Sequence, residues 1–378
     1  MSHADALRRI GVELTGVVGS TPERAASKRI APAYRSYEDL LDDHRVDVVH
    51  VATPNHLHYA QVKLALEARK HVVCEKPLAM TSAESAELVE LANATGLVHC
   101  TNFNVRFYPL LQEARERISS GELGEIWNVH GAYLQDWLAT PADWNWRLEP
   151  EKGGELRAVG DIGSHWLDLA QFLTGQTIVE VLADLATVIP VRQRPAGEVE
   201  TYGTAGESKP VDVAMSTEDI AHILLRFAGG ARGSCVFSQV SFGRKSALRI
   251  EADGSRGAVA WDGELHDRLW LGRRDRGNEL LQRHPTLMGT AARPHAHMPG
   301  SAEGHTDTFR ELYRAVYADV ASGGPSSKPE YPTFADGHKA NELGDAIARS
   351  NQERRWVVLP STSAADARPA TPSGLSGG

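Results

Sequence analysis

The sequence predicts a protein of two parts: an α/β part built on a parallel sheet, followed by an α+β part built on a large, mostly antiparallel open sheet. Over about the first third of the chain, apolar runs alternate with helical stripes through short connections, which is the pattern of βαβ units. Beyond about residue 125, apolar segments are joined by Gly-rich turns, which is the pattern of antiparallel hairpins. A chain of 378 residues also suits two domains better than one.

Each element of the first part follows from its local pattern. The run "VDVVHVATP" is continuously apolar, as in a strand buried on both faces, and Thr81 with Glu84 forms a capping-box pattern that begins a helix. In chain order we expect a strand over 11–19, a helix over 36–43, a strand over 46–54, a helix over 56–69, a strand over 71–77, a helix over 81–96 and a strand over 97–103.

The second part is predicted to be strand-rich with three helices. The expected strands lie within 126–137, 219–242, 246–263, 268–273 and 354–359, and the helices span 161–173, 307–321 and 334–352. A stretch rich in Gly, Pro and charge, 192–210, is predicted to be a surface loop. We therefore divide the chain into domains at 1–122 and 123–360, with a disordered tail at 361–378.

Composition excludes several functional classes. A net charge of −9 without a long basic run disfavours binding to nucleic acid. No apolar run approaches the roughly 20 residues that a membrane span needs. Three cysteines without metal-like spacing, Cys74, Cys100 and Cys235, and the lack of a signal peptide favour free thiols in the cytoplasm.

Polar residues follow three successive strands of the predicted parallel sheet. Since ligands bind off the carboxyl ends of such strands, these residues should line one edge of a pocket. Thr53, Asn55 and His58 follow one strand, Glu75 and Lys76 the next, and Asn104 and Arg106 the third. The alternative is that Thr53 and Asn55 only cap the following helix.

Lys76 is the most specific candidate among these residues. A lysine at the mouth of a buried strand is costly unless it faces a polar cleft. Pro77 restricts the backbone of Lys76 to an extended conformation, which directs its side chain. The alternative is a lysine in a surface loop.

The segment "GDIGSHWLDL" places Asp161, His165 and Asp168 along one face of a predicted helix. An imidazole beside a carboxylate can act as a general base near neutral pH. The alternatives are a structural histidine or a metal site. We expect no metal here, because no further His or Cys cluster supplies the remaining ligands.

These motifs together resemble the glucose–fructose oxidoreductase / inositol dehydrogenase (Gfo/Idh/MocA) family. The resemblance covers nearly the whole chain and rests on "ATPN" with His58, "CEKPLA", "NFNVRFYP", "WRLEPEKGG", "GDIGSHWLD" and "PTFADGHKANELGDAIARSNQERRWV". It implies a Rossmann-type domain, a second domain that mediates oligomerisation, and hydride transfer between a nicotinamide cofactor and a sugar or cyclitol. A homo-oligomer is expected on this ground alone.

The resemblance also implies roles for individual residues. Lys76 would orient the substrate hydroxyl and His165 would accept its proton, with Asp161 positioning the pair. The cofactor would be lined by Thr53, Asn55, His58, Glu75, Lys76 and Asn104, and approached by Arg147 from the second domain.

One family motif is missing. The chain has 34 glycines but no G-x-G, the turn that binds the cofactor's phosphates. The segment "MSHADALRRIG" resembles the second half of the first helix, so the first strand of the sheet is expected to be absent. We interpret this as a misassigned start codon, which the DNA upstream of Met1 would test, or as a decayed or repurposed member.

Cofactor type and reaction class stay open. After the strand that ends at Gly19 there is no acidic residue to bind a ribose hydroxyl, and Ser20, Thr21 and Arg24 favour NADP over NAD. The alternatives to a sugar oxidoreductase are an NAD-dependent glycosidase on the same scaffold and a non-catalytic sugar-binding or regulatory homologue. Possible pocket walls are Trp137, Trp144, Trp146, His295, His297 and His305.

Overall fold

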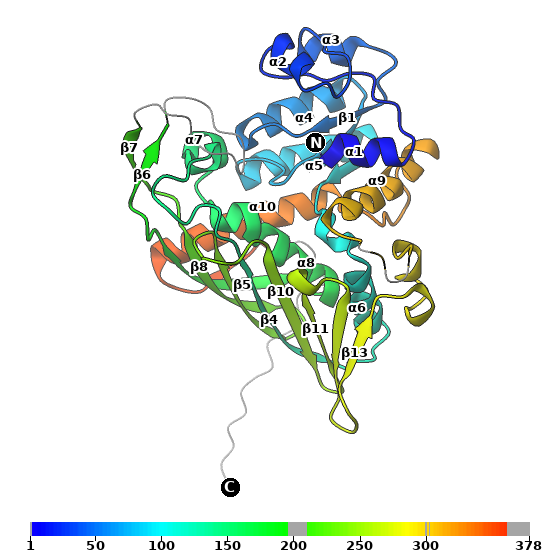
Figure 1. Cartoon of the computed structure of the whole chain (residues 1–378), viewed down its shortest axis with the longest axis vertical. Helices are drawn as coiled ribbons and strands as arrows, with labels where there is room; N and C mark the ends of the chain where they lie inside the picture. The colour runs from blue at the N-terminus through cyan, green and yellow to red at the C-terminus, as the bar shows by residue number, and fades with distance from the viewer. Residues whose placement is uncertain (1, 196–209, 299–300, 302, 361–378) are drawn as a thin grey trace.

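The computed structural model describes residues 2–195, 210–298, 301 and 303–360. Its N-terminal part contains a parallel sheet of three strands in the order β1-β2-β3, and its larger part contains a sheet of nine strands (Figure 1). Seven of the eight neighbouring strand pairs in the larger sheet are antiparallel, and only β4 and β9 run parallel. The predicted fold class is therefore confirmed.

The N-terminal part alternates helices and strands as predicted. Its elements are α1 (Ser2–Arg9), α2 (Pro22–Ser27), α3 (Tyr37–Asp42), β1 (Val48–Val51), α4 (His58–Glu67), β2 (His71–Cys74), α5 (Ser82–Thr95), β3 (His99–Thr101) and α6 (Pro109–Ser119). The predicted capping box begins α5, where the Thr81 hydroxyl accepts from the backbone of Glu84 and the Glu84 carboxylate accepts from the backbone of Thr81.

The three-stranded sheet is covered on both faces. Its strands are almost continuously apolar, so both faces carry side chains that are more stable when buried. One face packs against α4, α5 and the start of α10 (Phe334–Glu353), with Val72, Cys74 and Phe334 in the buried cluster. The other face packs against α1 and α9 (His305–Ala321), where Val73 and Leu312 are fully buried. The chain thus returns to the first sheet after completing most of the second.

The predicted strand over 11–19 is wrong. This segment makes only an isolated parallel bridge between Val17 and Ala33. Within the described residues no neighbouring strand lies along it, and without a ladder of interstrand hydrogen bonds an apolar run does not become a strand.

The larger part is built on strands that alternate between a buried and an exposed face. Its strands are β4 (Ile126–Leu134), β5 (Ile178–Ala186), β6 (Val191–Arg194), β7 (Val211–Ala214), β8 (Ile220–Phe227), β9 (Arg232–Ser238), β10 (Ala247–Gly254), β11 (Ala258–Asp262), β12 (Arg268–Gly272), β13 (Glu279–Gln282) and β14 (Val357–Val358). All except β6 and β7 form the nine-stranded sheet, in the order β13-β12-β11-β10-β4-β9-β8-β5-β14.

Helices cover one face of this sheet. They are α8 (Ser164–Thr174) and α10 (Phe334–Glu353), joined by α6 from the first part. By contrast, α9 (His305–Ala321) packs on the first sheet, and α7 (Pro150–Gly153) contacts the turn at Trp146–Leu148. Trp166 of α8 is fully buried, and its indole donates to the Arg249 carbonyl of β10. The opposite face carries exposed side chains such as Leu224 and Leu280. We call this second surface the open face of the sheet.

The loop predicted over 192–210 is corrected in part. Residues 191–194 form β6, which pairs with β7. Arg192 is fully buried, and its guanidinium is compensated there because it donates to Asp219 and to two carbonyl oxygens. Residues 196–209 and the predicted disordered tail, 361–378, lie outside the described residues. The domain boundary at 122/123 stays a prediction.

Among the described residues, no helix combines the length and the apolar character that crossing a membrane would require. Cys74, Cys100 and Cys235 are all buried free thiols.

Candidate active site

Lys76 follows β2 and points toward the second domain. Its ammonium nitrogen lies 2.9 Å from Asp161 Oδ1 and donates to the backbone carbonyl of Asp161 at 2.5 Å. Only 9% of the Lys76 side chain is exposed. Burial of a positive charge is unfavourable by itself, and the negative charge of Asp161 compensates it here. The two segments that carry the most specific motifs of the sequence therefore meet in space.

Asp161 is the centre of a polar cluster. It lies in a π-helical turn, Val159–Gly163, that leads directly into α8. Besides Lys76, its carboxylate accepts from Arg147 Nε at 3.2 Å and from Gln239 Nε2 at 2.8 Å. Burial acts to raise the pKa of Asp161, but the charges of Lys76 and Arg147 outweigh it and lower this pKa well below its usual range. The carboxylate is therefore ionised and holds both cations in place.

His165 lies one turn after Asp161, at the start of α8. Burial, followed by the positive charge of Lys76, lowers the pKa of His165 to about 3. Its ring packs edge-on against Phe103, with 5.9 Å between the ring centroids. Its Nδ1 atom is buried and has no hydrogen-bond partner among the described residues. The imidazole is thus neutral at physiological pH and able to accept a proton.

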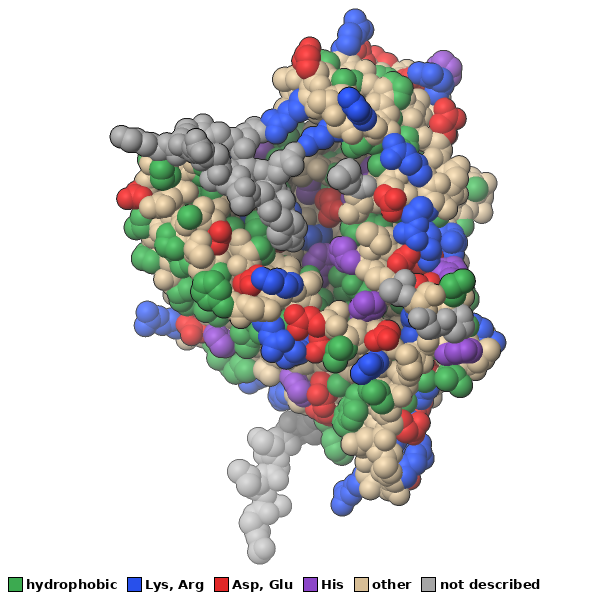
Figure 2. All heavy atoms as spheres, viewed as in Figure 1, with side chains coloured by type: hydrophobic (Ala, Val, Ile, Leu, Met, Phe, Trp, Pro, Cys, Tyr) green, Lys and Arg blue, Asp and Glu red, His purple; other side chains and the backbone are tan. Residues whose placement is uncertain are grey.

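A small cleft adjoins this cluster. A volume of about 250 Å³ is lined by Asn55, Lys76, Pro77, Arg147, Gly153, Leu156, Arg157, Gly160 and Asp161. A hydrogen bond joins the two parts of the molecule here, since the Asn55 amide donates to the Gly153 carbonyl at 2.7 Å. The space-filling view shows a hollow between the upper and lower parts, where histidine and acidic side chains gather (Figure 2).

Glu75 forms a second polar group beside Lys76. Its Oε1 atom lies 2.8 Å from His3 Nε2 and accepts from Asn102 Nδ2 at 2.6 Å. Burial acts to raise the pKa of Glu75, but the hydrogen bond from His3 and nearby positive charge lower it to about 2. Glu75 is therefore an ionised carboxylate, oriented by side chains from α1 and from the end of β3.

Other predicted cofactor residues make contacts within the protein. The Thr53 hydroxyl donates to Gln61. The buried His58 ring lies between the carbonyls of Thr53 and Pro77, at 2.9 and 2.7 Å. Asn104 is buried and donates to the Thr308 hydroxyl. These three side chains connect the loops at the sheet edge, so a part in cofactor binding stays a prediction for each.

Ser20 and Arg24 lie near the start of α2, and both are exposed. In Figure 1 this helix lies at the top of the molecule, whereas α8 lies near the middle. The Thr21 hydroxyl is already used as the cap of α2, because it accepts from the backbone of Arg24. A part in cofactor binding therefore stays a prediction for Ser20 and Arg24.

The structure adds one partner of the cluster that the sequence could not indicate, and it shows the contacts of three suggested wall residues. Gln239, which follows β9, carries no motif that could have marked it as a partner of Asp161. His305 lies close enough to His165 for its charge to lower the pKa of that ring, whereas His297 pairs with Glu311 at 2.8 Å. Trp144 is buried against Leu138 and Leu148.

Arg106 of the predicted pocket edge and Asp168 of the predicted helix face contact each other. Arg106 was expected at the pocket and Asp168 on the face that carries His165. Instead they form a buried ion pair with Arg106 Nε 2.7 Å from Asp168 Oδ2, and Asp336 of α10 joins it at 2.8 Å. This ion-pair network connects α8 to α10. The sequence did not indicate it, because helical spacing alone does not show which residue will approach a given carboxylate.

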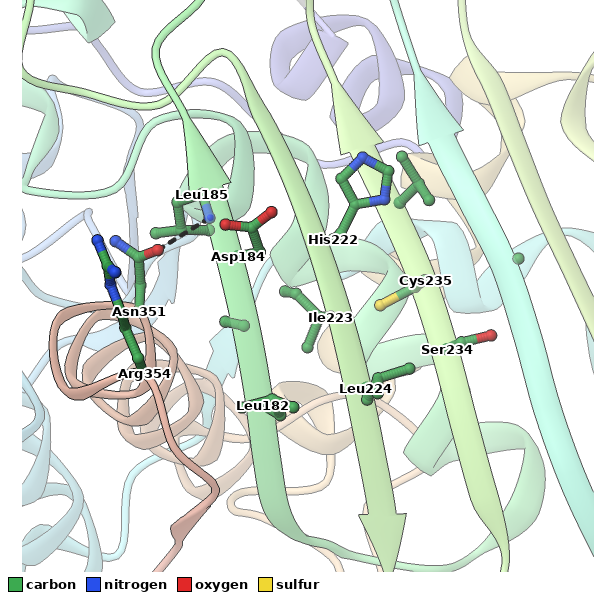
Figure 3. Close-up of a pocket in the computed structure, with 13 residues that line it drawn as sticks. Leu182, Asp184, Leu185, His222, Ile223, Leu224, Ser234, Cys235, Asn351 and Arg354 are labelled. Atoms are coloured by element: carbon green, nitrogen blue, oxygen red, sulfur yellow. Dashed lines mark hydrogen bonds between the residues drawn. The ribbon is translucent and has the colours of Figure 1, made fainter.

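A much larger groove lies away from this cluster. It measures about 1390 Å³ and occupies the open face of the sheet, where residues of β5, β8 and β9 face Asn351 and Arg354 at the end of α10 (Figure 3). None of the predicted site residues lines it. The candidate active site is therefore chosen by its grouping of charged side chains and not by the size of a groove.

The residues around the small cleft have the charged and polar chemistry that one end of a nicotinamide dinucleotide requires. The charged Lys76–Asp161 pair lines a polar space between the two parts. His165, with its unpartnered Nδ1 atom, lies one turn after Asp161. The glycine-rich turn that would bind the phosphates of the dinucleotide is not found, since the sequence has no G-x-G. The described residues therefore support a part in cofactor binding for the residues near Lys76, and they do not support one for a phosphate-binding loop.

Comparison with known proteins agrees with this geometry. A profile described as "Oxidoreductase family, NAD-binding Rossmann fold" matches residues 2–103, and one described as "GFO/IDH/MocA C-terminal domain" matches residues 111–260. The chain is 33% identical over 338 residues to levoglucosan dehydrogenase of Pseudarthrobacter phenanthrenivorans, covering 87% of this chain and 84% of that protein.

Two further comparisons extend the match. Myo-inositol 2-dehydrogenase of Thermotoga maritima is 26% identical over 337 residues, covering 87% of this chain and 85% of that protein. A solved structure of levoglucosan dehydrogenase in complex with NADH and L-sorbose superposes with a TM-score of 0.84 at 29% identity, covering 95% of each chain.

Proposed function

We propose that this chain, which belongs to the GFO/IDH/MocA family of NAD-binding oxidoreductases, transfers hydride between a nicotinamide dinucleotide and a hydroxyl-bearing carbon of a sugar or cyclitol. Its relatives include levoglucosan and inositol dehydrogenases. The observation that carries the proposal is the Lys76–Asp161 ion pair beside a neutral His165. These groups together can bind an alcohol oxygen and accept its proton.

The protein's part in the reaction follows from three side chains. A bound oxidised nicotinamide supplies the acceptor for the hydride. Lys76 donates a hydrogen bond to the substrate hydroxyl and stabilises the negative charge that develops on its oxygen. Asp161 fixes the position of that ammonium group. His165, whose imidazole is neutral, takes the hydroxyl proton on a ring nitrogen.

We propose the same roles for the flanking residues that the family resemblance implied. Arg147 approaches the reacting centre from the second domain, since it contacts Asp161 and stacks on Trp146 with 4.4 Å between the guanidinium carbon and the ring centroid. Glu75 and Asn55 flank Lys76 on the side of the first domain. Thr53, His58 and Asn104 hold the loops on which these residues lie.

A panel of polyols, aldoses and inositols tests the proposal. We expect one substrate class to change the near-ultraviolet absorbance of the nicotinamide in proportion to substrate consumed, with His165→Ala as the inactive control. Glycoside cleavage without net change in the cofactor would indicate a glycosidase instead. Sugar binding without any cofactor binding would indicate a regulatory homologue.

We propose NADP in preference to NAD. Ser20 and the exposed Arg24 follow the 11–19 segment and suit a 2′-phosphate, although the solved relative named above contains NADH. In a thermal-shift titration, Arg24→Ala should weaken NADP binding about tenfold and leave NAD binding unchanged. Arg35→Ala, whose partner is Asp39, is the control. Equal loss for both cofactors would contradict this preference.

We also propose a homo-oligomer that forms through the open face of the sheet. Leu224 and Leu280 are 46% and 60% exposed there, and apolar surface of this kind is often covered by a partner. Light scattering should show more than one chain per particle, and Leu224→Glu should shift it toward the monomer. A cytoplasmic location and the domain boundary at 122/123 stay part of the proposal.

A further inference from the structure

Three metal-ligating side chains meet at the centre of the open face. His130 lies on β4, and Glu251 and Asp253 lie on β10. Glu251 is the direct antiparallel partner of His130, and Asp253 is paired with Asn128, two residues from His130. Because side chains alternate along a strand, all three project from the same face of the sheet.

The distances between their polar atoms suit a single ion. His130 Nε2 lies 3.5 Å from Asp253 Oδ2 and 3.9 Å from Glu251 Oε2. One donor atom from each residue lies within 4.8 Å of the other two. A divalent cation bound at about 2.0–2.2 Å from each donor needs donors roughly 3–4 Å apart. Small side-chain adjustments therefore bring all three into the coordination shell.

The charge around this triad is not balanced by the protein. Among the described residues, no lysine or arginine forms an ion pair with Glu251 or Asp253. Arg249, the basic residue of the same strand and face, pairs with Asp262 and Glu264 instead. The Asn128 amide donates to Asp253 at 3.0 Å, but it is neutral. Two carboxylates on one strand thus face a single imidazole, and a cation between them is electrostatically favourable.

We propose that His130, Glu251 and Asp253 form a binding site for a divalent transition-metal ion, with Zn²⁺ as the representative. An imidazole together with carboxylates favours such an ion over Mg²⁺ or Ca²⁺, which prefer oxygen ligands alone. In the single chain the side chains keep between 34% and 40% of their surface exposed, so the remaining coordination positions lie on the same open face that we propose as the oligomer interface. The site lies on the face of the sheet opposite to α8, which carries His165, and it does not depend on the proposed function.

This site is separate from the metal site considered at Asp161 and His165, where the lack of further ligands disfavours binding of a metal ion. Its own ligands come from strands more than a hundred residues apart, as the Asn128–Asp253 bond across the same strand pair illustrates. No sequence spacing could have shown it.

Isothermal titration of the full chain, stripped of metal by chelation and dialysis, tests the proposal. We expect about one Zn²⁺ to bind per chain, and Co²⁺ to give a ligand-field absorption spectrum at the same site. Glu251→Gln and Asp253→Asn should each weaken binding by about tenfold or more, since even outer-shell changes cost roughly 10–100-fold. Circular dichroism verifies that both variants are folded.

His222→Gln is the matched control, because His222 lies on the same open face beside Asp184 but belongs to β8. We expect it to bind Zn²⁺ as the unmodified chain does. The proposal is overturned if Zn²⁺ does not bind, if binding is unchanged in both carboxylate variants, or if only His222→Gln abolishes it. Binding of Mg²⁺ in place of Zn²⁺ would also overturn it.

Discussion

The ammonium nitrogen of Lys76 lies 2.9 Å from a carboxylate oxygen of Asp161, although the two residues are 85 positions apart in the chain. The contact joins the end of β2 in the first sheet to the π-helical turn before α8 in the second part. It therefore fixes the relative position of the two halves of the cleft. The behaviour expected of His165 and Lys76 variants depends on it.

Replacing His165 with alanine should lower turnover by about 10²–10⁴-fold, the usual contribution of a positioned general base. The Lys76–Asp161 pair does not require the imidazole, so folding and cofactor binding should be retained. Steady-state kinetics with the best substrate of the panel measures the effect. His222→Ala, on the opposite face of the sheet, should have normal turnover. Unchanged turnover in His165→Ala would assign proton transfer to another group.

Replacing Lys76 with methionine should raise the pKa of His165 from its value of about 3, because the Lys76 charge is one of the causes that lower it. The pKa should remain below the usual 6.5, since burial is the larger cause and persists. Titration of the histidine ring protons by NMR reports this without any substrate. Lys152→Met, at an exposed pair with Glu149, should leave the His165 signal unaltered. A lower His165 pKa in Lys76→Met would contradict the proposed electrostatics.

Replacing Arg106 with methionine should destabilise the protein by about 3–5 kcal/mol, the typical cost of breaking a buried ion pair from one side. Asp168 and Asp336 would then be left near each other without a counter-charge. The pKa of Asp168 is already raised to about 6 by burial, and it should rise further in the variant. Urea unfolding gives the free energy. Arg35→Met, at an exposed pair with Asp39, should change stability by about 1 kcal/mol or less.

The stability of the protein should fall as pH is lowered from about 6.5 toward 4, in part because of His99. Burial lowers its folded-state pKa to about 4, so in this window the unfolded chain binds a proton that the folded chain does not. The contribution is at most about 1.4 kcal/mol per pH unit. In His99→Asn the amide oxygen can still accept from the backbone of Phe334, as Nδ1 does. Its unfolding free energy should therefore depend less on pH, whereas that of His44→Asn, an exposed histidine, should not differ from the unmodified chain.

Gly337 allows α10 to approach β3 closely. A Cβ atom there would lie 2.3 Å from Thr101 Oγ1 and 3.0 Å from Leu78 Cβ. Gly337→Ala should therefore destabilise the protein by about 1–3 kcal/mol through overpacking. Gly344→Ala in the same helix meets only Leu156 Cδ1 at 3.7 Å, and should be neutral or stabilising by up to about 1 kcal/mol. Thermal unfolding of both variants measures the difference, and equal destabilisation would argue against a packing cause.

Most of the secondary structure could be predicted from local patterns. The Thr81–Glu84 capping box begins α5 where expected, and the helix predicted over 307–321 is α9, His305–Ala321. Such features depend on neighbours three or four residues away, which the sequence displays directly. The predicted strand over 11–19 failed because a strand needs a partner that local pattern does not supply.

For the candidate active site, residue type and motif were enough to propose Lys76, Asp161 and His165 from the sequence. The amino-acid pattern determined which groups could do acid–base chemistry and on which elements they lie. The tertiary structure alone decided that Asp161 is shared among Lys76, Arg147 and Gln239, and that Asp168 turns away to Arg106. It also decided that His130 meets Glu251 and Asp253. The physical reason is that ionic and hydrogen-bond partners are chosen by distance in space, and long-range distances are set by how sheets and helices pack rather than by spacing along the chain.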